Sequence, residues 1–124
     1  MMVAEPNGRE ENGMPRQTIF EMPVSRVYPL LLAKVERKGR TKAELDEVIR
    51  WLTGYRMDGV DPGTPYGAFF ENAPDYNPRA ELITGKVCGV DVALIDDPLM
   101  KKIRQLDKLV DELAKGRPME KILR

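Results

Sequence analysis

Residues 39–55, "GRTKAELDEVIRWLTGY", decide the fold class of this chain. Thr41 and Glu44 have the T-x-x-E spacing of a capping box, in which each side chain bonds a backbone amide at the start of a helix. Gly54 is the residue type that most often ends a helix. Between them, four aliphatic side chains recur at the spacing of one helix face: Leu45, Val48, Ile49 and Leu52. The stretch therefore predicts an amphipathic helix within a helical domain.

A second amphipathic helix is expected just before this one, from about Ser25 to Lys38. Ser25 could cap its start, but Pro29 also suits a first helical turn, so the sequence leaves the start open between them. Gly39 ends the helix. Its apolar stripe has three aliphatic members: Val27, Leu31 and Val35. Two helices joined by so short a turn are either an ordinary packed pair or a DNA-reading helix-turn-helix.

The placement of charge favours the ordinary packed pair. A recognition helix presents its N-terminal side chains to DNA, but here that part of the helix carries Glu44, Asp46 and Glu47, which phosphate would repel. The basic residues lie in and around the turn: Arg37, Lys38, Arg40 and Lys42. Contact with nucleic acid through these four residues is the alternative.

The last long helix is predicted from Asp97, which can cap it, to Gly116, with Pro98 at its first position. Asp96 and Asp97 could together bind a divalent cation, but a cap and a carboxylate near the positive helix end explain both residues better. Pro118 begins a final helical turn. The apolar stripe of the long helix has six members: Leu99, Ile103, Leu106, Leu109, Val110 and Leu113.

Shorter elements are expected between the long helices. Residues 64–72 and 77–85 each begin with a cap residue followed by proline, which predicts two short helices. Residues 57–63 contain Asp-Gly and Asp-Pro-Gly, which are typical of turns. Residues 86–95, KVCGVDVALI, have the composition of a strand, but the chain offers no second strand to pair with it. We therefore expect a turn or an irregular buried segment there, with Cys88 buried and inert.

The N-terminal residues 1–17 have no apolar period and are expected to form a disordered tail. Residues 18–24, TIFEMPV, are expected to be a short extended segment, because Pro23 discourages a helix. The remaining residues, 18–124, have the length of one domain. The predicted fold is all-α: a compact single-domain bundle of about five helices, two of them short.

Composition excludes several kinds of chemistry. The chain has 124 residues, with 20 basic and 20 acidic side chains, so the net charge is zero and a dedicated nucleic-acid binder is disfavoured. It has no His and one Cys, which excludes Cys/His zinc sites, His relays and internal disulfides. The longest apolar run is far shorter than the roughly 20 residues that span a bilayer. We expect a cytoplasmic protein without cofactor, metal or catalytic residues.

Three long phrases of the sequence resemble a known family. They are ERKGRTKAELDEVIRWLTGY (36–55), NPRAELITGKVCGV (77–90) and DDPLMKKIRQLDKLVDELAKGRPMEKILR (96–124). They are similar to a family of small bacterial proteins called domain of unknown function 2200, over residues 18–124. The resemblance implies a compact, mainly helical domain and implies no activity. Residues 57–65, MDGVDPGTP, depart from the family, for which a longer and more helical stretch is expected.

Two surfaces are candidates for binding a partner. The first is a charge-rich face of the last long helix, where charges of opposite sign lie three or four residues apart: Arg104, Asp107, Lys108 and Asp111. The second is aromatic: Tyr66, Phe69 and Phe70. Because Phe69 and Phe70 are adjacent, we expect one to pack on the long helices and the other to line an exposed groove.

These features together favour a non-catalytic interaction or binding module, with an unknown protein partner or self-association. Two alternatives remain open. One is a nucleic-acid accessory protein that uses the basic turn. The other is a small enzyme without His, which would need a pocket holding a strongly perturbed Asp, Glu or Lys.

Overall fold

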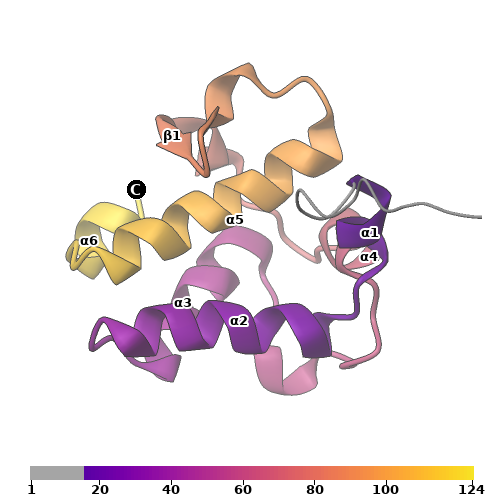
Figure 1. Ribbon diagram of the computed structural model, residues 1–124, viewed down its shortest axis with the longest axis horizontal. Coiled ribbons are helices and arrows are strands. Elements are labelled where there is room, and N and C mark those ends of the chain that lie inside the picture. The colour runs from indigo at the N-terminus through magenta and orange to yellow at the C-terminus, as the bar shows by residue number, and fades with distance from the viewer. Residues whose placement is uncertain (1–15) are drawn as a thin grey trace, which may run out of the picture.

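The structure, a computed structural model, describes residues 16–124. Its longest helix is α5 (Pro98–Ala114), and α2 (Val24–Arg37), α3 (Lys42–Thr53), α4 (Tyr66–Glu71) and α6 (Met119–Ile122) all pack against it. Helices α2 and α5 run across the molecule in the same direction, with α1 (Arg16–Glu21) and α4 at one end and α6 at the other (Figure 1). The predicted mainly helical fold is confirmed.

Helix α3 begins with the predicted capping box. The Thr41 hydroxyl accepts a hydrogen bond from Glu44 N at 3.1 Å, and Glu44 Oε1 accepts one from Thr41 N at 2.9 Å. Gly54 ends the helix in the left-handed conformation, with φ of +85°. All four residues of the predicted stripe are buried, so the sequence identified this helix and its face.

Helix α2 begins at Val24, so the prediction that Ser25 caps it or that Pro29 starts it is wrong. Val24 N donates to Thr64 O at 2.9 Å and Ser25 N donates to Pro62 O at 3.0 Å. The loop before α4 therefore supplies acceptors that a capping side chain would otherwise provide. With its first turn held in this way, the helix continues through Pro29.

The chain before α2 is helical where an extended segment was expected, so that prediction is wrong for residues 18–21. Helix α1 is short, and it forms because it packs against α4. A single bridge joins Pro23 to Pro65, and Tyr66 N donates to Met22 O at 2.7 Å. Of the predicted tail, residues 1–15 lie outside the described part of the chain, whereas Arg16 and Gln17 begin α1.

A small hairpin replaces the irregular segment expected at residues 86–95. Strands β1 (Lys86–Val87) and β2 (Val90–Asp91) pair antiparallel across a two-residue turn. Both turn residues have positive φ, 53° at Cys88 and 77° at Gly89, as a tight hairpin turn requires. The missing partner strand is thus the other half of the same segment. Cys88 lies on this turn and is exposed, so its predicted burial is wrong.

Three short 3₁₀ helices complete the described part of the chain: η2 (Met57–Gly59), η3 (Pro78–Leu82) and η4 (Val92–Leu94). Element η3 is the second predicted short helix, capped by Asn77 as expected but wound more tightly than an α-helix. At residues 57–63 the turn chemistry holds, since Gly63 N donates to Asp61 Oδ1 at 2.9 Å. The longer helical stretch expected from the family is absent between α3 and α4.

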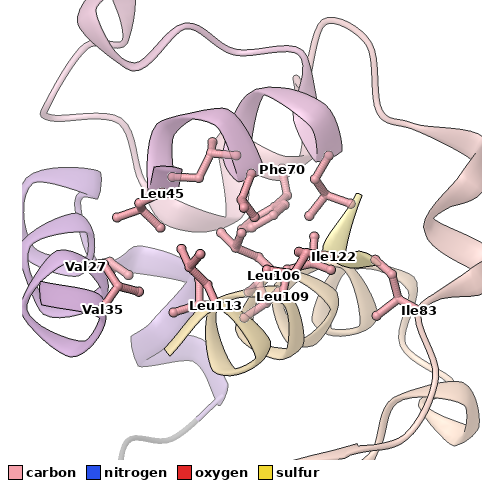
Figure 2. Close-up of a cluster of buried hydrophobic side chains, with 14 of the residues drawn as sticks. Val27, Val35, Leu45, Phe70, Ile83, Leu106, Leu109, Leu113 and Ile122 are labelled. Atoms are coloured by element: carbon pink, nitrogen blue, oxygen red, sulfur yellow. The ribbon is translucent and has the colours of Figure 1, made fainter. Parts of the chain in front are cut away.

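The core lies where α2, α3 and α4 meet α5 and is closed at one end by α6. Figure 2 shows side chains from these elements pointing toward one another. Phe69 and Phe70 are 2% and 0% exposed, so the expectation that one of them lines an exposed groove is wrong. Phe70 packs edge-on against Phe69 with ring centroids 5.2 Å apart, and both rings fit into the core. No helix within residues 16–124 combines the length and apolar character needed to cross a bilayer.

Candidate functional site

A cavity of about 470 Å³ opens between α1, α2, α4 and α5. Three of its lining residues carry polar groups: Tyr66, Arg104 and Asp107. Six apolar side chains form the rest of the wall within residues 16–124: Ile19, Val27, Leu30, Leu31, Met100 and Ile103. A mostly apolar wall with a few placed polar groups is the usual composition of a ligand site. We refer to these nine residues as the α2–α5 cavity.

Gly67 brings two walls of the α2–α5 cavity together. A Cβ atom at Gly67 would lie 3.2 Å from Phe20 Cβ and 3.3 Å from Phe20 O, so a glycine lets α1 approach α4 this closely. Ile19 of α1 and Tyr66 of α4 then line the same space. The sequence feature that fixes this geometry is therefore a small residue in a short helix.

The hydroxyl of Tyr66 is buried and has no hydrogen-bond partner within the described part of the chain. The Tyr66 ring is held edge-on to Phe70, with centroids 4.9 Å apart. Burial raises the pKa of Tyr66 well above its ordinary value, the charge of Asp107 adds to this shift, and Arg104 opposes it. The hydroxyl therefore stays protonated and can donate a hydrogen bond.

Arg104 and Asp107 form an ion pair in the cavity wall, with Nη1 and Oδ2 3.1 Å apart. Burial raises the pKa of Asp107, while the charge and hydrogen bond of Arg104 oppose that rise. The pair is partly exposed, at 31% for the Arg104 side chain and 22% for Asp107. It places one donor group and one acceptor group at the cavity that Tyr66 also lines.

A second hollow, of about 580 Å³, continues along α2 and α5 toward α6. Two aliphatic side chains and one carboxylate contribute to it: Leu30, Ala114 and Asp111. The other lining residues are cationic, and we call them the basic shelf: Lys34, Arg37, Lys38 and Lys115.

Asp111 lies between the cations of the basic shelf. It pairs with Lys115 at 3.1 Å and with Lys34 at 3.6 Å. Burial alone would raise the pKa of Asp111, but these lysines and Lys108 together lower it. The lowered pKa is a direct consequence of the positive surroundings, so this part of the surface is electropositive.

The predicted partner-binding residues do not form one surface. Tyr66, Arg104 and Asp107 line the α2–α5 cavity, and Asp111 lies on the adjoining hollow. Phe69 and Phe70 are in the core instead. Lys108 points to the hairpin, where its Nζ donates to Lys86 O at 3.1 Å. The charge-rich face is thus divided between two sides of α5.

The four residues of the basic turn are likewise separated. Arg40 is turned inward: its Nη1 donates to Arg117 O at 2.9 Å and to Leu113 O at 3.3 Å. Lys42 forms an ion pair with Asp46 at 2.8 Å. Of the four, Arg37 and Lys38 belong to the basic shelf. Of the basic side chains proposed for nucleic acid, Arg40 therefore bonds a distant part of the fold, and Lys42 pairs within its own helix.

A third hollow, of about 510 Å³, lies between η3 and α5. Its central polar groups bond one another, since the Tyr76 hydroxyl donates to Gln105 Oε1 and Gln105 Nε2 donates to Ala80 O at 3.3 Å. Lys102 lies 4.7 Å from the Tyr76 ring centroid. These groups are satisfied within the fold, unlike the hydroxyl of Tyr66.

Sequence reasoning missed most of the cavity wall. Leu30 is 61% exposed and belongs to both adjoining hollows, although it lies beside the predicted stripe. Lys34 follows it by one helical turn. The signal that could have pointed to them is an apolar residue followed by cations on one edge of a helix. Ile19 could not be identified, because its helix was not predicted.

Comparison with known proteins identifies relatives without a described activity. Residues 18–124 match a family described as "Uncharacterized protein conserved in bacteria (DUF2200)". One similar solved structure is entitled "Crystal structure of uncharacterized protein SP1917". It is 46% identical in sequence, superposes with a TM-score of 0.83, and the match covers 90% of this chain and 94% of that chain. A search of curated proteins found no match.

Proposed function

This chain belongs to the bacterial DUF2200 family, as the sequence resemblance predicted, and from that premise we propose that it is a non-catalytic binding module whose site is the α2–α5 cavity. The ligand group that suits this cavity is apolar and carries one hydrogen-bond acceptor, such as the carbonyl of an amide. The apolar part contacts the six apolar side chains of the wall. The acceptor meets the Tyr66 hydroxyl once the side chains that close it off from water in the free chain have moved aside.

The observation that carries this proposal is the buried Tyr66 hydroxyl, which has no hydrogen-bond partner among residues 16–124. A buried polar group left unsatisfied costs about 1–3 kcal/mol, whereas phenylalanine would fill nearly the same space without that cost. A binding function accounts for the tyrosine, because a bound acceptor supplies the missing hydrogen bond. The neighbouring Arg104–Asp107 pair can complete the recognition of an amide, by donating to its oxygen and accepting from its nitrogen.

The test is a titration of the full, ¹⁵N-labelled chain with n-hexanamide, followed by the backbone amide signals. Signals of Leu30, Tyr66 and Ile103 should shift together and saturate. Tyr66→Phe should weaken binding severalfold, because the ring stays and only the donor is lost. Shifts confined to other parts of the chain, or equal affinity in Tyr66→Phe, would contradict the proposal.

Two exposed leucines provide a matched control for this titration. Leu30 is 61% exposed at the mouth of the cavity, and Leu94 is 75% exposed outside it. Leu30→Asp should weaken hexanamide binding, and Leu94→Asp should leave it unchanged. Since both side chains are mostly in solvent, neither substitution should change the fold.

A second candidate function, a small enzyme, is favoured by one observation. Asp107 lines the cavity and burial raises its pKa, as a carboxyl that exchanges protons requires. The hydrogen bond from Arg104 instead suits a fixed carboxylate that orients a ligand. If Asp107→Asn still binds hexanamide and the amide stays intact over days with the wild-type chain, the binding module is supported; hydrolysis that Asp107→Asn abolishes would favour the enzyme.

A further inference from the structure

We propose that the α2–α5 cavity and the basic shelf form one groove, and that its occupant is an acidic peptide segment of another protein with an apolar anchor. This inference rests on the proposed binding function and names the partner. The apolar anchor enters the cavity beside Tyr66, and acidic side chains of the same segment lie along the basic shelf.

The two hollows are continuous along the packed helices. Leu30 lines both of them, and helices α2 and α5 run side by side in the same direction (Figure 1). Lys34 and Asp111, which line the second hollow, join the two helices, with Nζ and Oδ1 3.6 Å apart. At 1.5 Å per residue, the groove runs about 18 Å along α5 from Ile103 to Lys115, which matches about three turns of a bound helix.

The charge of the groove is unbalanced although that of the chain is not. The whole chain has 20 basic and 20 acidic residues, so a basic excess in one place is local. Five cationic side chains line the groove: Arg104 and the four residues of the basic shelf. Among the residues that the structure describes, the carboxylates that line it are those of Asp107 and Asp111. An acidic partner is therefore attracted to this face and oriented by it.

Helix dipoles do not by themselves explain the basic shelf. A cation near the C-terminal end of a helix is favourable, and this accounts for Lys34, Arg37 and Lys115 one at a time. The dipole effect does not explain why these three cations and Lys38 all line one hollow beside an exposed leucine. A binding surface for an acidic segment explains both the convergence and the exposure of Leu30.

A peptide fits the groove better than the other anionic partners. The apolar half of the groove offers a nucleic acid no stacking surface. Tyr66 is the aromatic residue that lines it, and its ring is buried and cannot stack with a base. A single-chain amphiphile carries its charge at one end, whereas the cations extend over more than one turn of α2 and onto α5. An amphipathic helix with apolar residues in one half and several acids in the other meets both halves of the groove.

The experiment measures fluorescence anisotropy of a labelled peptide bound to the full chain. The probe is a peptide of about 14 residues, long enough for about 21 Å of helix, with two leucines in one half and four glutamates in the other. The control peptide replaces the glutamates with glutamines. We expect the glutamate peptide to bind at least about tenfold more tightly, and added salt to weaken it.

Matched charge reversals locate the binding. Arg37→Glu with Lys38→Glu should weaken the glutamate peptide at least about tenfold, because both side chains lie on the basic shelf. Arg50→Glu with Lys121→Glu makes the same change in net charge with exposed residues outside the groove, and it should change affinity by less than about twofold. Equal effects of the two double variants would overturn the inference.

The remaining outcomes separate this inference from the proposed function. If n-hexanamide binds at Tyr66 but the two peptides bind equally or not at all, the acidic partner is wrong and the binding module stands. If an oligonucleotide or an anionic vesicle binds at the basic shelf and the glutamate peptide does not, the partner class is wrong. If the glutamate peptide binds the wild type and Leu30→Asp alike, the cavity is not its anchor and this inference fails, whereas the binding module is decided by the hexanamide titration alone.

Discussion

At the scale of single residues, position 54 requires glycine for two reasons, its backbone conformation and the lack of space for a side chain. It has φ of +85°, and a Cβ atom there would lie 2.8 Å from Asp75 Cβ and 3.0 Å from Asp75 N. Asp75 N in turn donates to Thr53 O at 3.1 Å. Gly54→Ala should lower the free energy of unfolding by about 2–4 kcal/mol, since left-handed strain and overpacking add.

Gly39 is the control for that substitution. It has the same φ of +85°, but a Cβ atom there would meet nothing within 4 Å. Gly39→Ala should therefore show the conformational cost alone, about 1 kcal/mol. Urea denaturation of both variants measures the difference. Equal losses in the two variants would mean that the contact with Asp75 relaxes without cost.

Tyr66→Phe should stabilise the free protein while weakening binding. The hydroxyl is buried without a partner in the described chain, and its removal relieves a desolvation cost, so the free energy of unfolding should rise by about 1 kcal/mol. Thermal unfolding without added ligand measures this, with Tyr55→Phe as the control. The Tyr55 hydroxyl donates to Phe69 O at 2.8 Å, so its loss should destabilise. A destabilised Tyr66→Phe would indicate that the hydroxyl is structural.

Sequence reasoning worked at this scale where one side chain bonds its own neighbourhood. Thr41 and Glu44 fix a helix start within four residues, and Asp97 caps α5 by accepting from Leu99 N at 2.9 Å, as predicted. It failed where burial depends on distant elements. The packing of α4 buries Phe70, and the hairpin turn exposes Cys88. The residues next to each of them do not predict either outcome.

At the scale of elements, Arg40 joins the start of α3 to the end of α5. It bonds both oxygens of Glu44 and the carbonyls of Leu113 and Arg117. Arg40→Ala should lower the free energy of unfolding by about 1–3 kcal/mol, because charge-assisted hydrogen bonds to two elements are lost. Arg37→Ala is the control, because Arg37 is an exposed cation three residues earlier in the chain. It should change stability by less than about 0.5 kcal/mol.

The stabilisation by Arg40 should depend on pH in a known direction. The hydrogen bond from Arg40 lowers the pKa of Glu44, and the amide of Thr41 adds to this shift. A carboxyl with a lowered pKa stabilises the fold above its ordinary pKa and loses that contribution as the pH falls through the lowered value. The destabilisation by Arg40→Ala should therefore shrink in acid. A constant difference from neutral to acidic pH would assign the effect to the two carbonyls alone.

Elements were predictable when their apolar face and both ends were encoded locally. Helices α3 and α5 meet this condition, and their predicted bounds agree with the structure to within about two residues. Helix α1 and the β1–β2 hairpin do not meet it. Helix α1 has six residues and forms against α4, and each strand of the hairpin has two residues. Elements this short are stabilised by tertiary contacts, so their own sequences carry little signal.

At the scale of the whole molecule, the candidate site arises from the arrangement of helices rather than from any one of them. The sequence pointed to Arg104, Asp107 and Tyr66, but it could not place Tyr66 beside the other two, because residues 66 and 104 meet only when α4 packs on α5. The cationic members of the groove come from two helices that are about 70 residues apart in the chain. The sequence placed Arg104 on one candidate surface and Arg37 and Lys38 on another, and it placed Lys34 and Lys115 on neither.

The same arrangement gives two neighbouring aspartates opposite roles in acid stability. Asp107 and Asp111 lie one turn apart on α5, yet burial raises the pKa of Asp107, and the surrounding lysines lower that of Asp111. A carboxyl with a raised pKa binds its proton more tightly in the folded state, so its contribution to stability falls as the pH rises above its ordinary value. For Asp111, stability is present above the ordinary value and is lost as the pH falls through the lowered one.

Replacing each aspartate by asparagine should therefore give opposite pH dependences. As the pH falls from about 7 to about 3, wild type should gain stability relative to Asp107→Asn and lose stability relative to Asp111→Asn. The free energy of unfolding from urea denaturation, measured across this range, gives both differences. The two substitutions make the same chemical change on one helix, so helix propensity and the removal of one carboxylate are matched. Slopes of the same sign would mean that Asp107 and Asp111 share one environment, and that the apolar cavity and the basic shelf do not differ electrostatically in solution.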